Sequence, residues 1–305
     1  MFNTPIAIFI FNRPQCTEQL VKALSLVKPT RLFVIADGPR NNFEIELCEQ
    51  TRAVIENIDW PCTIIKRYAT SNIGCRESIP NGLKYVFDQV DTCIILEDDC
   101  IPQPSFFPYC EELLYRYKYD ERVMTIGGHR SDGPNELDTE SYYFSKYPSI
   151  WGWATWKEKW AKYDLNMSQW ADLKDSNWLD DVLNTTKAVA YWSRMFDYMK
   201  NGLDTWDYAL TYSCWLHKGV SIRSRVNMIS NIGFGQNATH THQTDMADIY
   251  ANSIDIKFPL NHPISLSIDK DIDDRIEWVS FSGMDERMLE IARSRINKLR
   301  SHEVS

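Results

Sequence analysis

The sequence predicts an α/β fold in which helices flank a mostly parallel sheet. From the N-terminus to about residue 127, short apolar runs rich in β-branched residues alternate with segments of helical period, which is typical of parallel strands joined by crossover helices. Polar residues directly follow several of these runs. Because open parallel sheets bind ligands beyond the carboxyl ends of their strands, these polar residues are the candidate binding residues.

Five strands are expected in this first part, each a short apolar run. They cover residues 6–11, 32–36, 63–66, 93–96 and 123–126. Helices are expected between most of them, because apolar residues recur at helical spacing after Cys16, across residues 45–58 and across residues 79–90. These apolar stripes are predicted to pack in the core.

The second half of the chain has a different composition. Beyond residue 130 the alternation stops, and nine of the eleven tryptophans lie between residues 151 and 215. No repeat or linker separates the halves, so residues 1–245 are expected to form one unit, followed by a helical extension over residues 246–305. The last helix is amphipathic and basic, which fits docking on the core or contact with anionic lipid heads.

Composition narrows the class of protein. The net charge of −9 argues against nucleic acid as a partner. No apolar run reaches the roughly 20 residues of a membrane span, and no export signal is recognised, so a cytoplasmic protein is expected. The eight cysteines include no CxxC pair, which indicates free buried thiols instead of a zinc or dithiol site.

Three consecutive acids, Glu97, Asp98 and Asp99, end the fourth expected strand. Two like charges 4 Å apart repel by about 4 kcal/mol at an effective dielectric near 20, so the cluster needs solvent or a cation. A divalent cation with oxygen ligands fits this need. Alternation along an extended chain would put Glu97 and Asp99 on one side and Asp98 on the other. The alternative is a solvated strand end before the turn at residues 102–104.

Two polar segments follow other strands. Asp37 precedes Gly38 at the end of the second strand, where its carboxylate would accept hydrogen bonds from a base or ribose, or would belong to a plain turn. Asn72 and Arg76 flank the start of a helix whose N–H groups would face a phosphate. Arg76 in solvent is an equally good interpretation. The chain has neither a GxGxxG nor a GxxxxGK[ST] motif.

Aromatic and histidine motifs mark the second half. Trp151 and Trp153 flank Gly152 and present flat faces suited to stacking on sugar rings, although tryptophans also pack in cores. Trp206 precedes Asp207, which is a candidate general base or a surface acid. One member of the pair His240 and His242 would complete a metal site begun by Asp99, or both lie on the surface.

These motifs in this order resemble the GT-A superfamily of nucleotide-sugar glycosyltransferases up to about residue 245. The turn Phe11-Asn12-Arg13-Pro14 is similar to one in family 2-like bacterial sugar transferases, and the Glu-Asp-Asp run is similar to that of N-acetylglucosaminyltransferase I. The resemblance implies a GT-A type, Rossmann-like fold. It implies a nucleotide-binding half over residues 1–127 and an aromatic-rich, acceptor-side half over residues 128–245.

The resemblance also implies a role for each motif. Asp99 would bind Mn²⁺ or Mg²⁺ with His240 or His242, and Asp207 would be the catalytic base, although Tyr208 replaces the second acid of the family's segment. The acceptor would lie against Trp151, Trp153 and Trp206. The nucleotide-sugar would contact Phe11, Asn12, Arg13, Asp37, Asn72, Arg76, Glu97 and Asp98.

The function that these features predict is an inverting, metal-dependent glycosyltransferase. As the resemblance implies, it would move a sugar, from a UDP-sugar by preference, to a glycan or glycolipid during synthesis of bacterial surface polysaccharide such as lipopolysaccharide or capsule. It would act in the cytoplasm, free or peripherally attached to the inner membrane. Two alternatives stay open: a sugar-phosphate nucleotidyltransferase, which would need a glycine-rich basic loop after the first strand, and a non-catalytic carbohydrate-binding protein, which the tryptophan density favours.

Overall fold

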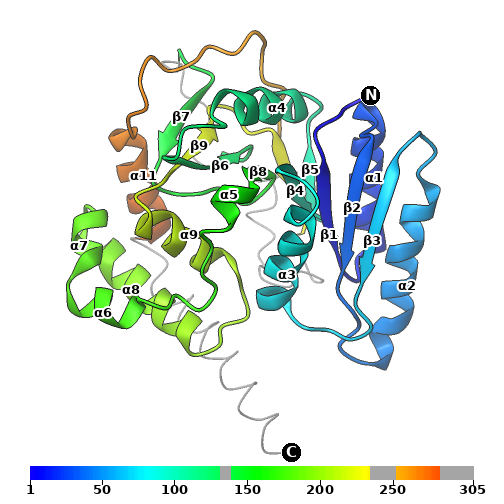
Figure 1. The fold of residues 1–305 in the computed structure, drawn as a ribbon, viewed down its shortest axis with the longest axis horizontal. Coiled ribbons are helices and arrows are strands. Elements are labelled where there is room, and N and C mark those ends of the chain that lie inside the picture. Colours follow the sequence, from blue (N-terminus) through cyan, green and yellow to red (C-terminus); the bar gives the residue numbers. More distant parts are fainter. Residues whose placement is uncertain (131–138, 234–251, 282–305) are drawn as a thin grey trace, which may run out of the picture.

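The computed structural model describes residues 1–130, 139–233 and 252–281. At its centre lies an eight-stranded sheet, accompanied by a small two-stranded one (Figure 1). The five predicted strands are confirmed as β1, β2, β3, β4 and β6. The strands are β1 (Ile6–Ile10), β2 (Arg31–Ala36), β3 (Thr63–Tyr68), β4 (Thr92–Glu97), β5 (Cys100–Pro102), β6 (Val123–Gly127), β7 (Tyr142–Ser145), β8 (Trp153–Trp156), β9 (Val220–Ser224) and β10 (Ile229–Asn231).

The large sheet is mostly parallel, as predicted. Its strand order is β3-β2-β1-β4-β8-β6-β9-β7. Strands β1 to β4 run parallel, and β8 pairs antiparallel with both β4 and β6, so β6 and its parallel neighbour β9 share the direction of β1. Only β8 and β7 run the other way within the described sheet. The parallel strands therefore bring their carboxyl ends to one edge.

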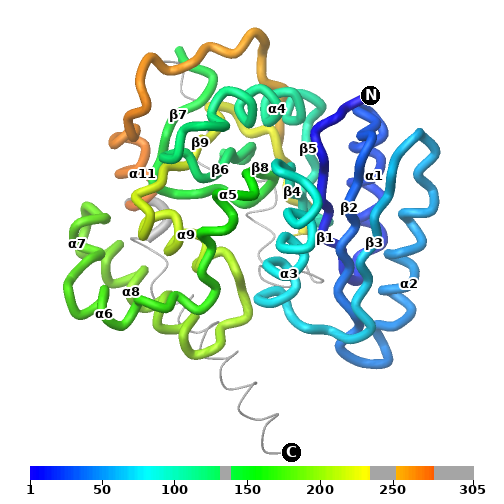
Figure 2. Tube along the Cα trace, viewed as in Figure 1, coloured from blue at the N-terminus to red at the C-terminus, as the bar shows by residue number. Residues whose placement is uncertain are grey.

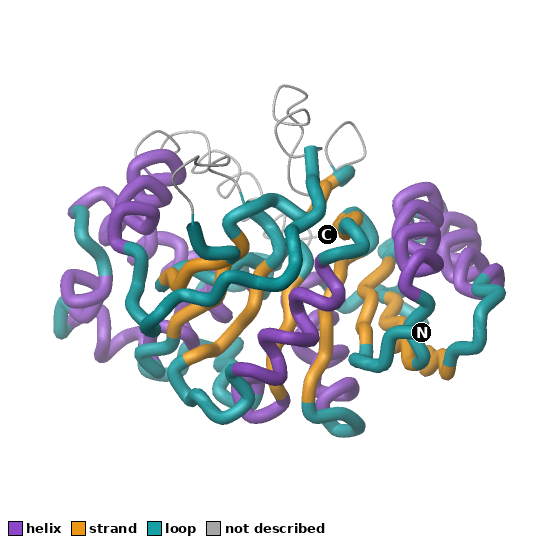
Figure 3. The backbone as a smooth tube through the Cα atoms, turned by 90° about the horizontal axis from the view of Figure 1, so that it is seen from above, coloured by secondary structure: helices purple, strands orange, loops and turns teal. Residues whose placement is uncertain are grey.

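Helices cover both faces of the sheet (Figure 3). The predicted helical segments appear as α1, α2 and α3. The described helices are α1 (Pro14–Val27), α2 (Ile45–Val54), α3 (Cys75–Phe87), α4 (Phe106–Arg116), α5 (Lys157–Trp160), α6 (Trp170–Asp175), α7 (Trp178–Val182), α8 (Thr186–Lys200), α9 (Asp207–Leu216) and α11 (Lys270–Phe281), with short 3₁₀ turns η1 (Asn42–Glu44) and η2 (Ile55–Asn57).

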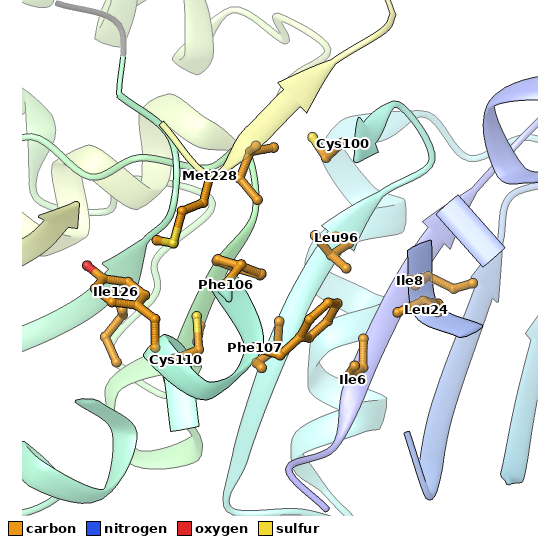
Figure 4. Packing of buried hydrophobic residues seen from close by; sticks show 14 of the residues in the cluster. Ile6, Ile8, Leu24, Leu96, Cys100, Phe106, Phe107, Cys110, Ile126 and Met228 are labelled. Carbon is orange, nitrogen blue, oxygen red and sulfur yellow. The ribbon is translucent and has the colours of Figure 1, made fainter. Parts of the chain in front are cut away.

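Alternation along the strands builds a core on each face. Ile6 and Ile8 of β1 pack with residues of α1 and α4, such as Leu24 and Phe107 (Figure 4). The alternate residues of β1, Ala7 and Phe9, pack with α3 and α9 on the other face. A strand buried on both faces needs a continuous apolar sequence, and this is what the run IAIFI provides.

A third cluster is rich in aromatic residues of the second half. It joins α6, α7, α8 and α9 to α11, and many of its tryptophan and tyrosine rings pack edge to face. Trp170, Trp192 and Trp215 are buried there. Much of the tryptophan density thus builds a core.

The predicted halves share one sheet, because β8 of the second half lies between β4 and β6 of the first. Residues 252–269 run past α4 to α11, which packs against β7 and α8 (Figure 2). The basic C-terminal helix that the sequence predicts lies outside the described residues. All eight cysteines are free, and five are buried. No helix in the described part of the chain is long and apolar enough to span a membrane.

Candidate functional site

A cavity of about 400 Å³ opens at the carboxyl edge of the sheet. It lies where β1, β2 and β4 end, between the start of α3 and the loop that precedes α9. Ligand sites in open α/β sheets occupy this edge. The predicted site residues that line the cavity are Phe11, Arg13, Asp37, Asn72, Glu97, Asp98, Asp99, Trp151, Trp206 and Asp207.

Arg13 holds two acids of the β4 cluster together. Its Nη2 lies 2.9 Å from Asp98 Oδ1, and its Nη1 lies 2.9 Å from Asp99 Oδ2. The predicted separation of Asp98 from Asp99 is therefore wrong. Strand β4 ends at Glu97 and the chain turns through the next two residues, so strand alternation no longer applies there. The guanidinium of Arg13 therefore neutralises part of the negative charge for which the sequence predicted a divalent cation.

Glu97 has no such partner. Its carboxylate makes no hydrogen bond or ion pair within the described residues, and burial, followed by the charges of Asp99 and Asp98, raises its pKa well above the ordinary value. Burial also raises the pKa of Asp98, although Arg13 opposes it. One arginine thus faces three acids, which leaves an excess of negative charge in the cavity.

The end of β10 closes over Asp99. The backbone N–H of Ile232 donates to the carbonyl oxygen of Asp99 at 2.9 Å, and a Cβ on Gly233 would lie 2.2 Å from Asp99 Oδ2. Glycine is therefore needed at position 233 for this close approach. His240 and His242 lie outside the described residues, and no group of three or more metal-ligating side chains exists among the residues that are described.

Asp37 is engaged by its own chain. Its carboxylate accepts hydrogen bonds from the N–H groups of Gly38, Ile73 and Gly74 and from Asn72 Nδ2, at 2.8 to 3.1 Å for the shortest contact with each. A carboxylate has about four acceptor positions, so these donors nearly fill it. Asp37 therefore fixes the loop after β3. Asp37 therefore has little acceptor capacity left for the predicted hydrogen bonds to a nucleoside.

The start of α3 is also occupied by the protein. Asp204 accepts the N–H of Arg76 at 2.9 Å, and the N–H groups before it donate to Asp37. The guanidinium of Arg76 donates to the carbonyl oxygens of Met199 and Leu203. The predicted phosphate contact of this helix start is thus replaced by two carboxylates. Arg76 and Asp204 fix the loop between α8 and α9.

That loop carries Asp207 into the cavity. Asp207 is the first residue of α9, and Thr205 Oγ1 donates a hydrogen bond to its Oδ1. Trp206 stacks on Trp153 with 5.6 Å between ring centroids, and Tyr163 donates to the carbonyl oxygen of Trp206. The packing of Trp206 against Trp153 and its hydrogen bond from Tyr163 thus fix the backbone next to Asp207.

The predicted aromatic residues occupy different positions. Trp151 lines the cavity and packs against His129, with 4.5 Å between the ring centroids. Trp153 is only 1% exposed, because it lies in the central strand β8, and it reaches the site only through Trp206. Its predicted stacking on an acceptor sugar does not fit this burial.

Asn12 is displaced from the cavity as well. Its Nδ2 donates to Glu44, which also binds Arg40, and Arg40 covers the ring of Phe11 at 5.1 Å. Sequence reasoning missed Arg40 and Asp204, both of which line the cavity, because neither belongs to a motif. The close approach of Gly233 to Asp99 was not foreseen either, because the two residues are far apart in the chain.

Comparison with known proteins finds only solved structures of low similarity to this chain. No protein-family model and no curated protein sequence matches the chain. A structure of UDP-glucose pyrophosphorylase complexed with UDP-glucose is similar at 8% identity and a TM-score of 0.39, over 72% of this chain and 90% of that one. 4-Diphosphocytidyl-2C-methyl-D-erythritolsynthase from Anaerococcus prevotii is similar at 12% identity and a TM-score of 0.34, over 70% and 98%.

HddC from Yersinia pseudotuberculosis is similar at 10% identity and a TM-score of 0.32, over 52% of this chain and 78% of that one. At such identities and TM-scores the likeness decides neither the family nor the reaction, and the GT-A resemblance stays a prediction.

Proposed function

We propose that the chain is a glycosyltransferase that moves a sugar from a nucleotide-sugar to a hydroxyl group of a glycan or glycolipid. One observation carries the proposal: a single cavity joins the acid cluster of β4 to Asp207 at the start of α9. Burial, then the charges of Asp99 and Asp98, and least of all the charge of Asp207, raise the pKa of Glu97, and both Glu97 and Asp207 line this cavity. Such an arrangement provides one place for a charged donor and another for an acceptor.

The chemistry follows from these positions. The acceptor hydroxyl attacks the anomeric carbon, Asp207 takes the hydroxyl proton, and the bond between the anomeric carbon and the diphosphate oxygen breaks. The nucleoside diphosphate leaves with the bonding electrons. Attack from the face opposite the leaving group inverts the anomeric centre.

Asp99 is the residue that would hold Mn²⁺ or Mg²⁺, with the donor diphosphate supplying further ligands. The unpaired Glu97 carboxylate and the close approach of Gly233 to Asp99 fit a cation at this point. Mg²⁺ sites commonly combine one or two carboxylates with substrate phosphates, so a larger protein ligand set is not required. The ion would neutralise charge on the leaving diphosphate. UDP-sugars remain the favoured donors, and His240 or His242 the additional ligand.

The charge of the cavity favours this reaction over nucleotidyl transfer. Among the described residues that line it, the basic ones are Arg13 and Arg40, and both pair with carboxylates. A nucleoside triphosphate would need basic groups that are free to bind it. This lining of described residues supports glycosyl transfer more than nucleotidyl transfer.

The products distinguish the alternatives. Wild-type protein is incubated with Mn²⁺ and UDP-, GDP- or CMP-sugars, and the released nucleotide is measured with and without glycan acceptors. We expect release of a nucleoside diphosphate, reduced about 10²- to 10⁴-fold in Asp207→Asn because the base is lost. Asp88→Asn, which changes an exposed acid, is the matched control.

Formation of a nucleotide-sugar and pyrophosphate from a nucleoside triphosphate and a sugar 1-phosphate would support the nucleotidyltransferase instead. Glycan binding that ignores nucleotide and survives chelation would support the binding protein.

A further inference from the structure

The charges along the carboxyl edge of the sheet change sign from one strand to the next. Strand β4 ends in acids, whereas Arg130 follows β6 and Arg223 and Arg225 lie at the end of β9. Arg130 and Arg223 are buried, at 4% and 6% exposed. Burial lowers the pKa of the neighbouring His129 to about 3, so this imidazole adds no charge. The edge therefore has a basic end beyond the acidic one.

Arg223 differs from the other arginines of this end. Arg225 forms an ion pair with Asp269 at 2.9 Å, and Arg130 donates to the carbonyl oxygen of Arg225. The guanidinium of Arg223 makes no hydrogen bond or ion pair with any residue that the structure describes, and its Nε is buried without a partner.

The acid whose charge acts on Arg223 is committed elsewhere. Asp273 accepts hydrogen bonds from Ser145 Oγ and from the N–H of Lys146. It forms no ion pair with Arg223. A buried guanidinium that forms neither an ion pair nor a hydrogen bond destabilises a protein, and an anion that binds it directly removes this cost. Arg223 is thus a buried cation without a direct partner among the described residues, which is suited to binding an anion.

The sheet fixes where this residue lies relative to the reaction. Ile95, Trp153, Gly127 and Arg223 are paired in one row across β4, β8, β6 and β9, so they share a face. With about 4.8 Å between strands, Arg223 lies about 10 Å from Trp153 along the row. Trp206, which precedes Asp207, stacks on Trp153. Arg223 therefore lies on the face of the sheet that carries Trp153, two strands further along and on the side away from the acid cluster.

We propose that the acceptor carries a phosphate group and that Arg223 binds it. That the phosphate belongs to the acceptor rests on the proposed function, but binding of a phosphate to Arg223 needs neither donor nor metal. The planar guanidinium matches a phosphate with two parallel hydrogen bonds. The phosphate would belong to a free sugar phosphate or to a lipid that bears the growing glycan.

The test is thermal unfolding of the full chain in EDTA, without nucleotide, in the presence of glucose 6-phosphate, glucuronate or glucose. We expect glucose 6-phosphate at about 100 times its Kd to raise Tm by about 3–6 °C, and glucose to have no effect. The rise should disappear in Arg223→Gln and persist in Asp99→Asn. It should also persist in Arg122→Gln, whose side chain is 62% exposed. A rise with glucuronate equal to that with glucose 6-phosphate would overturn the choice of phosphate.

The source of the phosphate is a separate arm. Cosedimentation with phosphatidylcholine vesicles that contain phosphatidic acid, lost in Arg223→Gln, would identify a lipid phosphate. A glucose 6-phosphate effect without cosedimentation would identify a free sugar phosphate. Both results support a phosphate site at Arg223.

A second variant guards against a folding defect. If Arg223 is unpaired in the free protein, Arg223→Met should raise Tm in the absence of phosphate. A lower Tm would show that Arg223 is structural and would overturn the inference, as would a phosphate effect that survives Arg223→Gln. Nucleoside diphosphate release without any phosphate effect would overturn this inference and leave the proposed function standing. A phosphate effect without nucleoside diphosphate release would overturn the proposed function and leave the phosphate site at Arg223 standing.

Discussion

At the end of β4 three carboxylates meet one arginine, whereas at the end of β9 the buried Arg223 forms no ion pair with a carboxylate of the described residues. Both places lie on the same edge of one sheet. The acids come from consecutive positions and are partly compensated by Arg13, which the turn after β1 supplies. Each end is thus only partly compensated by charges of opposite sign, which fits a cation with the donor at one end and an anion of the acceptor at the other.

Removal of Arg13 should give the largest effect on stability. Arg13→Met leaves the buried Asp98 and its neighbour Asp99 without their shared cation, and we expect the free energy of unfolding to fall by about 3–5 kcal/mol. Urea denaturation measures it. In contrast to Arg223→Met, which should stabilise, this substitution should destabilise. Arg122→Met, which breaks an exposed pair, should cost less than about 0.5 kcal/mol. Equal effects of Arg13→Met and Arg122→Met would show that Arg13 does not hold the acid cluster together.

Gly233→Ala should disturb the acidic end alone. The new Cβ would lie 2.2 Å from Asp99 Oδ2 and 3.0 Å from Arg13 Nη1, so we expect a loss of about 1–3 kcal/mol and weaker Mn²⁺-dependent nucleotide binding. The matched control is Gly202→Ala, where the Cβ meets no atom within 4 Å but φ is +89°. It should lower stability through backbone strain without changing nucleotide affinity. A parallel loss of affinity in both variants would rule out a specific role of Gly233.

Asp204→Ala should have the smallest effect on stability and a larger one on activity. It removes the acceptor for the N–H of Arg76 at the start of α3, which is worth about 1 kcal/mol for a helix cap. Because the same contact fixes the loop that carries Asp207, we expect kcat to fall more than KM rises. Asp204→Asn keeps an acceptor oxygen and should restore most of both. If kcat were unchanged in Asp204→Ala, the loop would not position Asp207.

The fold was predictable from the sequence where burial imposes a strict pattern. Strands buried on both faces must be continuously apolar, and this requirement revealed β1, β2 and β4. It did not reveal β8, whose sequence WATW looks like an aromatic motif, or β9, whose sequence VSIRS carries buried polar side chains. Both strands are recognisable only through their neighbours in the sheet.

The candidate site was predictable where its residues are adjacent in the chain. The acids of β4 and the pair Trp206-Asp207 reach the cavity as expected. The partners that neutralise or position them come from distant segments: Arg13 meets Asp99, and Asp204 meets Arg76. No local pattern encodes such pairs. For the same reason the sequence suggested free ligand-binding groups at Asp37 and at the start of α3, where the protein supplies its own partners.

Calorimetric titration of UDP into wild type and Asp99→Asn, with Mn²⁺ or with EDTA, tests the metal-dependent donor site most directly. We predict binding to the wild type that requires Mn²⁺ and is weakened at least about tenfold, or 1.4 kcal/mol, in Asp99→Asn. The other nucleoside diphosphates and CMP are titrated in the same way, because the donor nucleotide is unassigned. Nucleotide binding that is equally strong in EDTA and in Asp99→Asn, or no binding of any nucleotide, would contradict the account.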